Sequence, residues 1–189
     1  MKKISSSGKY LPFFGVTTLR FVQRASLERV EQCLVSCGLS RIFSPLPCES
    51  YHMTVFDLVV PEKAQTHKKF KRFLLDNSPV LKNISSVCER TEATFCSLVA
   101  VYWTNGTIGL EVSYNDEGLR DKISKASGIH NKPYKFHITL AYRIRDGAPS
   151  MEQLKALELC LNRVFPGGSV PLTRCFVCKF EDMTEFIKI

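Results

Sequence analysis

The stretches Tyr51-His52-Met53-Thr54-Val55 and Phe136-His137-Ile138-Thr139-Leu140 repeat one pattern in this 189-residue chain: apolar, His, apolar, Thr, apolar. Side chains alternate between the two faces of a β-strand, so each copy presents one imidazole and one hydroxyl on the same face. If the two strands lie side by side, one pocket receives two proton-transfer groups and two neutral hydrogen-bond donors. Such a set is suited to the chemistry of phosphate esters.

Length and composition predict an ordinary globular protein in which residues 1–189 form a single domain. The chain is 44% hydrophobic, which is enough for a sizeable core. Its apolar runs are far shorter than the roughly 20 residues that cross a bilayer. The first residues lead into no apolar signal segment. We therefore expect a cytoplasmic protein with no membrane contact.

The chain has eight cysteines, and without a secretory signal we expect reduced thiols. Cys33 and Cys37 would share a helix face that also carries core residues, which favours a role as small apolar filler. Cys175 and Cys178 form a lone C-x-x-C, and within a strand their sulfurs would face opposite sides. We therefore expect no metal and no other cofactor.

A net charge of +8 is partly concentrated in one run: Lys63, Lys68, Lys69, Lys71 and Arg72. Apolar residues between these cations predict an amphipathic helix, with Pro61 in its first turn and the charges on the solvent side. The alternative is a contribution to binding an anionic ligand. Even without contact, a positive field would help to attract a nucleotide or an RNA end.

The first half of the chain reads as a strand, a helix and a His-x-Thr strand, followed by the basic helix. The first strand covers 15–22, and Ser26 caps a helix that ends at Gly38. The first His-x-Thr strand runs over about 51–60.

The second half follows a similar order. Asn105-Gly106 predicts a hairpin between strands 95–104 and 107–114. A helix from Asn115 to Gly128 then precedes the second His-x-Thr strand. Ser150 and Gln153 have the spacing of a capping box for the last helix, and a final strand pair covers 170–180 and 184–189.

These residues resemble a known family, the two-histidine (2H) phosphoesterase superfamily, whose members carry paired His-x-Thr/Ser motifs. The match is carried by His52-Met53-Thr54 and His137-Ile138-Thr139, each on an apolar strand with similar elements around it. Segments 133–142 and 180–186 look like a little-characterised, LigT-like or 2′-5′ phosphodiesterase-like subgroup. The resemblance implies a bilobal, pseudo-symmetric α+β fold in which two antiparallel sheets form a central groove with helices outside.

The resemblance also implies a metal-independent phosphodiesterase that cleaves 2′-5′ or cyclic bonds of nucleotides, such as 2′-5′ oligoadenylate or cyclic GMP-AMP. One of His52 and His137 would act as base and the other as acid, in either order. Thr54 and Thr139 would donate hydrogen bonds to the non-bridging phosphate oxygens. The expected partner is a nucleotide or short oligonucleotide, and the chain is expected to be a monomer.

Two alternatives stay open. One is a 2′,3′-cyclic phosphodiesterase acting on RNA ends or tRNA-processing products. The other is a catalytically silent RNA-binding module, although the intact histidines and threonines count against it. A zinc hydrolase is weaker still, because the four histidines form no closely spaced ligand cluster.

Three further residues are candidates for substrate binding because of their spacing from the histidines. Lys135 and Arg143 lie at even spacing from His137 and, on a regular strand, would project to its side and hold phosphate. Phe56 has the same relation to His52 and could stack on a base. Each of the three also has a plausible structural role. Tyr102, just before the hairpin turn, is expected to serve packing.

Overall fold

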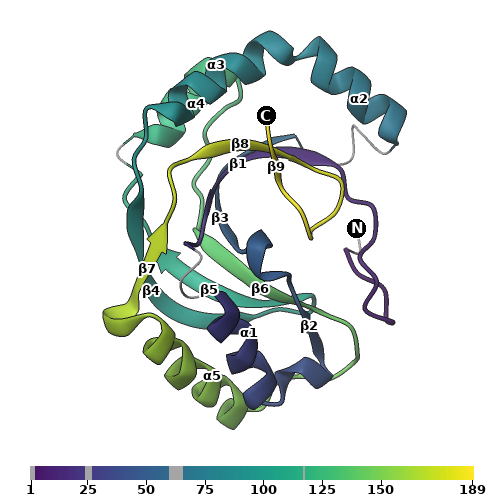
Figure 1. The fold of residues 1–189 in the computed structure, drawn as a ribbon, viewed down its shortest axis with the longest axis vertical. Coiled ribbons are helices and arrows are strands. Elements are labelled where there is room, and N and C mark those ends of the chain that lie inside the picture. The colour runs from purple at the N-terminus through teal and green to yellow at the C-terminus, as the bar shows by residue number, and fades with distance from the viewer. Residues whose placement is uncertain (1–2, 24–26, 60–65, 117) are drawn as a thin grey trace.

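The computed structural model in Figure 1 describes residues 3–23, 27–59, 66–116 and 118–189. This part of the chain holds five α-helices and nine β-strands. In chain order they are β1 (Gly15–Phe21), α1 (Leu27–Ser36), β2 (Phe43–Pro45), β3 (His52–Val59), α2 (His67–Asp76), α3 (Ser78–Glu89), β4 (Thr94–Trp103), β5 (Thr107–Ser113), α4 (Leu119–Ser127), β6 (His137–Arg143), α5 (Met151–Val164), β7 (Ser169–Leu172), β8 (Phe176–Phe180) and β9 (Ile187–Lys188).

Among the described residues, the strands form one antiparallel sheet in the order β7-β4-β5-β6-β3-β1-β8-β9, with β2 paired to β6. The sequence predicted two sheets. The structure has one, because β3 and β6 join its two halves through a single residue pair, Met53 and Ile138. A bridge between Val22 and Leu172 brings the end of β1 beside β7, so the sheet curls back on itself.

Helices cover the sheet in two groups (Figure 1). Helices α3 and α4 pack on each other, with α3 against β8 and α4 against β3. Helices α1 and α5 pack together, with α5 against β4. The α+β order predicted from sequence is largely confirmed. Helix α3 was not predicted, and the strand expected over 170–180 is divided into β7 and β8.

Local capping signals explain where several helices begin and end. The hydroxyl of Ser150 accepts a hydrogen bond from the Gln153 backbone, and the Gln153 side chain accepts one from the Ser150 backbone, which confirms the capping box. Gly128 ends α4 with a φ of 71°, in the left-handed region that favours glycine. The predicted cap Ser26 lies outside the described residues.

The basic run lies on an amphipathic helix, as predicted. Thr66 caps α2 by accepting a hydrogen bond from the Lys69 backbone. Phe70 is 2% exposed on the inner side of α2. The cations of this helix are exposed on the other side. Pro61 and Lys63 lie outside the described residues.

The expectation that all cysteines are reduced thiols is wrong in one place. Cys33 of α1 and Cys160 of α5 form a disulfide, with their Cα atoms 5.7 Å apart. The two residues are 127 positions apart in sequence. Their closeness follows from the packing of α1 on α5, which spacing along the chain does not reveal. The remaining six cysteines are free thiols.

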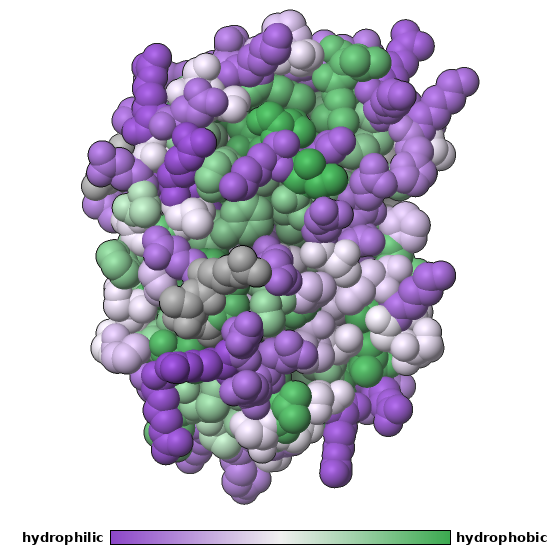
Figure 2. All heavy atoms as spheres, viewed as in Figure 1, coloured by the Kyte–Doolittle hydropathy of each residue, from purple (hydrophilic) through white to green (hydrophobic). Residues whose placement is uncertain are grey.

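No helix in the described ranges is both long and apolar enough to cross a membrane. On the face shown in Figure 2, hydrophilic side chains surround apolar ones that lie mostly toward its middle.

Candidate active site

The two His-x-Thr motifs lie on adjacent strands and meet at their middle residues. Met53 of β3 pairs with Ile138 of β6 in antiparallel orientation, and the two side chains are 0% and 1% exposed. The residues on either side of this pair face the opposite side of the sheet. The side chains gathered there are those of His52, Thr54, His137 and Thr139.

Antiparallel pairing crosses the two motifs. Around the central pair, His52 lies across from Thr139, and Thr54 lies across from His137. The two histidines are therefore diagonal neighbours, a relation that typically places residues about 7–8 Å apart, with their Cβ atoms somewhat closer.

Each histidine is oriented by the backbone carbonyl two residues before it. The Nδ1 atom of His52 lies 2.6 Å from the carbonyl oxygen of Ser50, and Nδ1 of His137 lies 3.2 Å from that of Lys135. A carbonyl can only accept, so Nδ1 carries the proton in both rings. In a neutral imidazole this leaves Nε2 as the nitrogen that can accept a proton.

The two histidines differ in their surroundings. His52 is 9% exposed, and its ring centroid lies 4.1 Å from that of Phe186. Burial lowers the pKa of His52 to about 4; the hydrogen bond with Ser50 opposes this effect, and the charges of His137 and Lys3 add to it. His137 is only partly buried. At neutral pH, His52 is therefore an uncharged proton acceptor.

Two tyrosines connect the threonines to His137. The ring centroids of Tyr102 and Tyr134 lie 6.1 Å and 5.9 Å from that of His137. Burial raises the pKa of Tyr134, and a hydrogen bond with the Thr54 side chain lowers it in part. Burial likewise raises the pKa of Tyr102, which has a hydrogen bond with the Thr139 side chain.

Gly109 makes room for Tyr102 to reach the site. A Cβ atom on Gly109 would lie 2.5 Å from the carbonyl oxygen of Ile138 and 3.0 Å from the Tyr102 hydroxyl. Only glycine leaves this space free. The sequence analysis assigned Tyr102 to packing, because nothing in its position before the turn indicates that it crosses β5 toward the second motif.

Each motif is followed directly by a β-bulge. Val55 is an extra residue in β3 relative to β1, and Leu140 is an extra residue in β6 relative to β5. In both strands the extra residue comes directly after the threonine of the motif. An extra residue changes the face to which the following side chains point. Beyond each threonine, even spacing from the histidine therefore no longer predicts the face of the sheet to which a side chain points.

The bulges affect two of the predicted substrate contacts, Phe56 and Arg143. Phe56 does not face the histidines: it is 3% exposed, and its ring centroid lies 5.3 Å from the guanidinium carbon of Arg120. Arg143 also lies beyond a bulge. Its Nη2 atom is 3.8 Å from a carboxylate oxygen of Asp146, and it lines a cavity of about 410 Å³ together with Lys3 and Tyr142.

Asp57 and Tyr142 each lie five residues beyond a histidine of the motifs, and Lys3 interacts with both. Its ammonium nitrogen lies 3.3 Å from the Tyr142 hydroxyl and 4.6 Å from the ring centroid of Phe13. Burial lowers the pKa of Lys3, and the charge of Asp57 raises it. Lys3 thus places a half-buried cation near the motifs. It escaped the sequence analysis because the fold alone brings the amino-terminal segment to this place.

The remaining predicted contact, Lys135, precedes β6 and is exposed. Strand alternation therefore does not fix where its side chain points, and its carbonyl is the group that contacts His137.

In the described ranges, no three or more His, Cys, Asp or Glu side chains are grouped as metal ligands would be. Cys175 and Cys178 are both buried, at 1% and 0% exposure.

Known proteins with a similar arrangement identify the fold. No family model matches the chain. Among solved structures, a protein of unknown function from Agrobacterium tumefaciens, ATU0111, is 22% identical with a TM-score of 0.66, over 99% of this chain and 89% of that one. LigT of E. coli, in complex with NADP+, is 12% identical with a TM-score of 0.58, over 94% of this chain and 95% of LigT. The fold of this chain is LigT-like.

A sequence relative carries no established function. The uncharacterised protein 127L of Invertebrate iridescent virus 6 is 25% identical over 76% of this chain and 72% of its own length. The 2H phosphoesterase-like fold therefore rests on structural likeness, and the activity has to be argued from the residues themselves.

Proposed function

We propose that this protein is a metal-independent phosphodiesterase that cleaves 2′-5′ or cyclic phosphodiester bonds of nucleotides by two-histidine acid/base catalysis. The observation that carries the proposal is the pairing of Met53 with Ile138, which sets both His-x-Thr motifs on one face. Two imidazoles and two hydroxyls are then gathered on that face. These groups supply proton transfer and charge stabilisation from the chain itself.

In this proposal His52 is the general base and His137 the general acid. The low pKa of His52, caused mainly by burial, keeps its Nε2 unprotonated and ready to take a proton from the nucleophile. The nucleophile is water for a cyclic phosphate, or a neighbouring ribose hydroxyl for a 2′-5′ linkage. His137, on the other side of phosphorus, gives a proton to the leaving oxygen. This arrangement permits in-line displacement.

The threonines stabilise the charge that develops on the non-bridging oxygens. The rings of Tyr134 and Tyr102 lie beside His137 and flank this group of side chains. Lys3 adds positive charge nearby and strengthens binding of the anionic group.

A nucleotide substrate is supported by what a structural neighbour binds. LigT of E. coli has been solved with ATP and with 3′-AMP, at 13% identity to this chain in both cases. The net charge of +8 agrees with a polyanionic substrate.

The test is an assay panel with purified protein in excess chelator. The substrates are 2′-5′ oligoadenylate, cyclic GMP-AMP, a 2′,3′-cyclic nucleotide and 3′-5′ RNA. We expect cleavage of 2′-5′ oligoadenylate or cyclic GMP-AMP at a rate that the chelator does not change. Loss of cleavage in the presence of chelator would contradict the metal-independent mechanism. Cleavage of the 2′,3′-cyclic nucleotide alone would assign the protein to RNA ends, and binding without turnover would make it an RNA-binding module.

A further inference from the structure

One cavity lies not at the histidines but on the reverse face of the same strands. It has a volume of about 550 Å³ and opens between the end of α3, the segment after β5 and the start of α4. Arg20 of β1 contributes to its lining and pairs with Met53, while its neighbour Phe21 pairs with His52. Adjacent residues of a strand point to opposite faces, so Arg20 faces away from the histidines.

Arg20 is a buried cation that forms no ion pair with the carboxylates of the described residues. It is 4% exposed, and its Nη1 atom donates to the carbonyl oxygens of Glu92 and Thr173 at 2.7 Å and 2.8 Å. Its Nε atom is buried and has no hydrogen-bond partner in the described part of the chain. The three ion pairs found among the described residues all involve other side chains. The Tyr114 ring centroid lies 5.5 Å from the guanidinium carbon, but burying a cation without a counter-charge is costly, which favours a bound anion.

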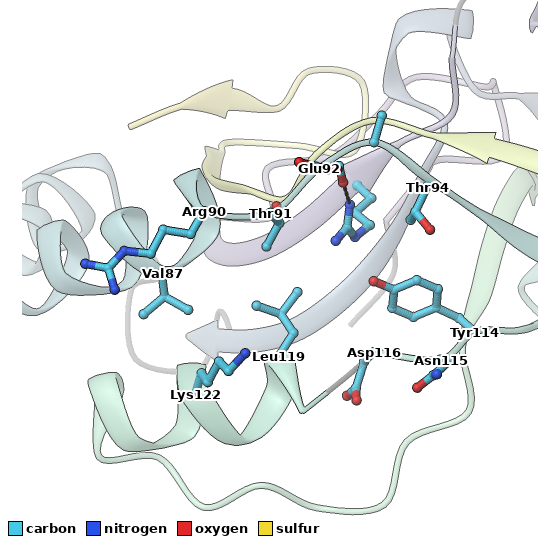
Figure 3. Close-up of a pocket in the computed structure, with 12 residues that line it drawn as sticks. Val87, Arg90, Thr91, Glu92, Thr94, Tyr114, Asn115, Asp116, Leu119 and Lys122 are labelled. Atoms are coloured by element: carbon cyan, nitrogen blue, oxygen red, sulfur yellow. Dashed lines mark hydrogen bonds between the residues drawn. The ribbon is translucent and has the colours of Figure 1, made fainter.

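Two exposed cations, Arg90 and Lys122, extend the positive charge to the opening of this cavity. Figure 3 shows Arg90 and Thr94 on one side of the opening and Lys122 and Asp116 on the other. The lining also contains two carboxylates, Glu92 and Asp116, and the ring of Tyr114. The cations can hold an anionic group, and the carboxylates can accept hydrogen bonds from hydroxyls beside it.

We propose that this cavity, lined by Arg20, Arg90 and Lys122, is a second binding site for a small phosphorylated compound that also carries hydroxyl groups. Its volume lies in the usual range of about 300–1,000 Å³ for small-molecule sites. The site is independent of the histidine site, because the two lie on opposite faces of β1 and β3. The alternative is that Arg20 only braces β1 against the segments that supply its two carbonyl partners.

The test follows backbone amide NMR signals during titration with inorganic phosphate and with ribose 5-phosphate. A variant carrying His52→Ala and His137→Ala is used beside the natural protein, so that binding at the histidines is removed. We expect residues 90–94 and 114–116 to shift in both proteins, with tighter binding of ribose 5-phosphate than of phosphate. Shifts confined to 52–54 and 137–139, or no shifts in the His52→Ala, His137→Ala variant, would overturn the second site.

Charge-matched pairs of substitutions separate a site from a general attraction. Arg90→Ala with Lys122→Ala removes two cations from the opening. Lys82→Ala with Lys125→Ala removes two exposed cations of α3 and α4 that do not line the cavity. We expect at least a tenfold loss of affinity for ribose 5-phosphate in the first pair and an unchanged affinity in the second. Equal losses in both pairs would show that only the overall charge attracts the ligand.

Discussion

Met53 and Ile138 pair across β3 and β6 as the one residue pair that joins these two strands. Both are fully buried, so the joint is anchored in the core while the residues beside it face the other way. The two copies of the motif therefore have the same local geometry. Each histidine is held by a carbonyl two residues before it, and each threonine is followed by a bulge.

The pH dependence of activity tests the role of His52 as base. Because burial lowers its pKa to about 4, the acid limb of the kcat/KM profile should lie near pH 4. Phe186→Ala exposes His52 and should move this limb toward pH 6.5, whereas Phe186→Leu keeps an apolar cover and should move it less. An acid limb that stays in place in Phe186→Ala would assign it to another group.

The same burial links stability to pH. The unfolded chain takes up a proton at His52 below about pH 6.5, whereas the folded protein does so only near pH 4. Protonation therefore favours unfolding, and the free energy of unfolding should fall by up to about 3 kcal/mol as pH drops through this window. Denaturant unfolding at several pH values measures it. His52→Gln should remove this part of the slope; an unchanged slope would show that His52 does not cause it.

Lys3 is expected to help bind the phosphate group. Lys3→Met removes a half-buried cation near His52 and should lower kcat/KM about tenfold, which is about 1.4 kcal/mol of transition-state stabilisation. Lys9→Met removes an exposed cation from the same segment and serves as the control. Equal rates for the two variants would exclude a direct role for Lys3.

Gly109 is expected to be essential for the position of Tyr102. Gly109→Ala places a Cβ atom 2.5 Å from the Ile138 carbonyl oxygen, so it should destabilise the fold by about 1–3 kcal/mol and lower kcat. Gly106→Ala, in the turn between β4 and β5, meets no atom within 4 Å and should be tolerated. Thermal unfolding and kcat measured on both variants provide the check. A tolerated Gly109→Ala would contradict the crowding inferred here.

The sequence predicts the order of most elements and the motif pair, because strand alternation, caps and an Asn-Gly turn are local signals. The bulges at Val55 and Leu140 have no comparable signal, so spacing along the sequence does not give the faces of Phe56 and Arg143. Lys3 comes near the histidines through tertiary packing alone, and periodicity cannot reveal this.

The disulfide between Cys33 and Cys160 and the position of Arg20 also depend on which elements become neighbours. In each case the missing information is long-range. The disulfide depends on the packing of α1 against α5, and the position of Arg20 depends on two carbonyl groups that are distant from it in sequence.

The most direct test of the central claim is kcat/KM for His52→Ala and His137→Ala, measured on the best substrate of the panel. His130→Ala, an exposed histidine outside the motifs, is the control. Loss of a general acid or base typically costs about 10²–10⁴-fold in rate, so each motif variant should lose at least that much while keeping its circular dichroism spectrum. The control should keep the wild-type value. A wild-type kcat/KM in either motif variant would contradict two-histidine catalysis.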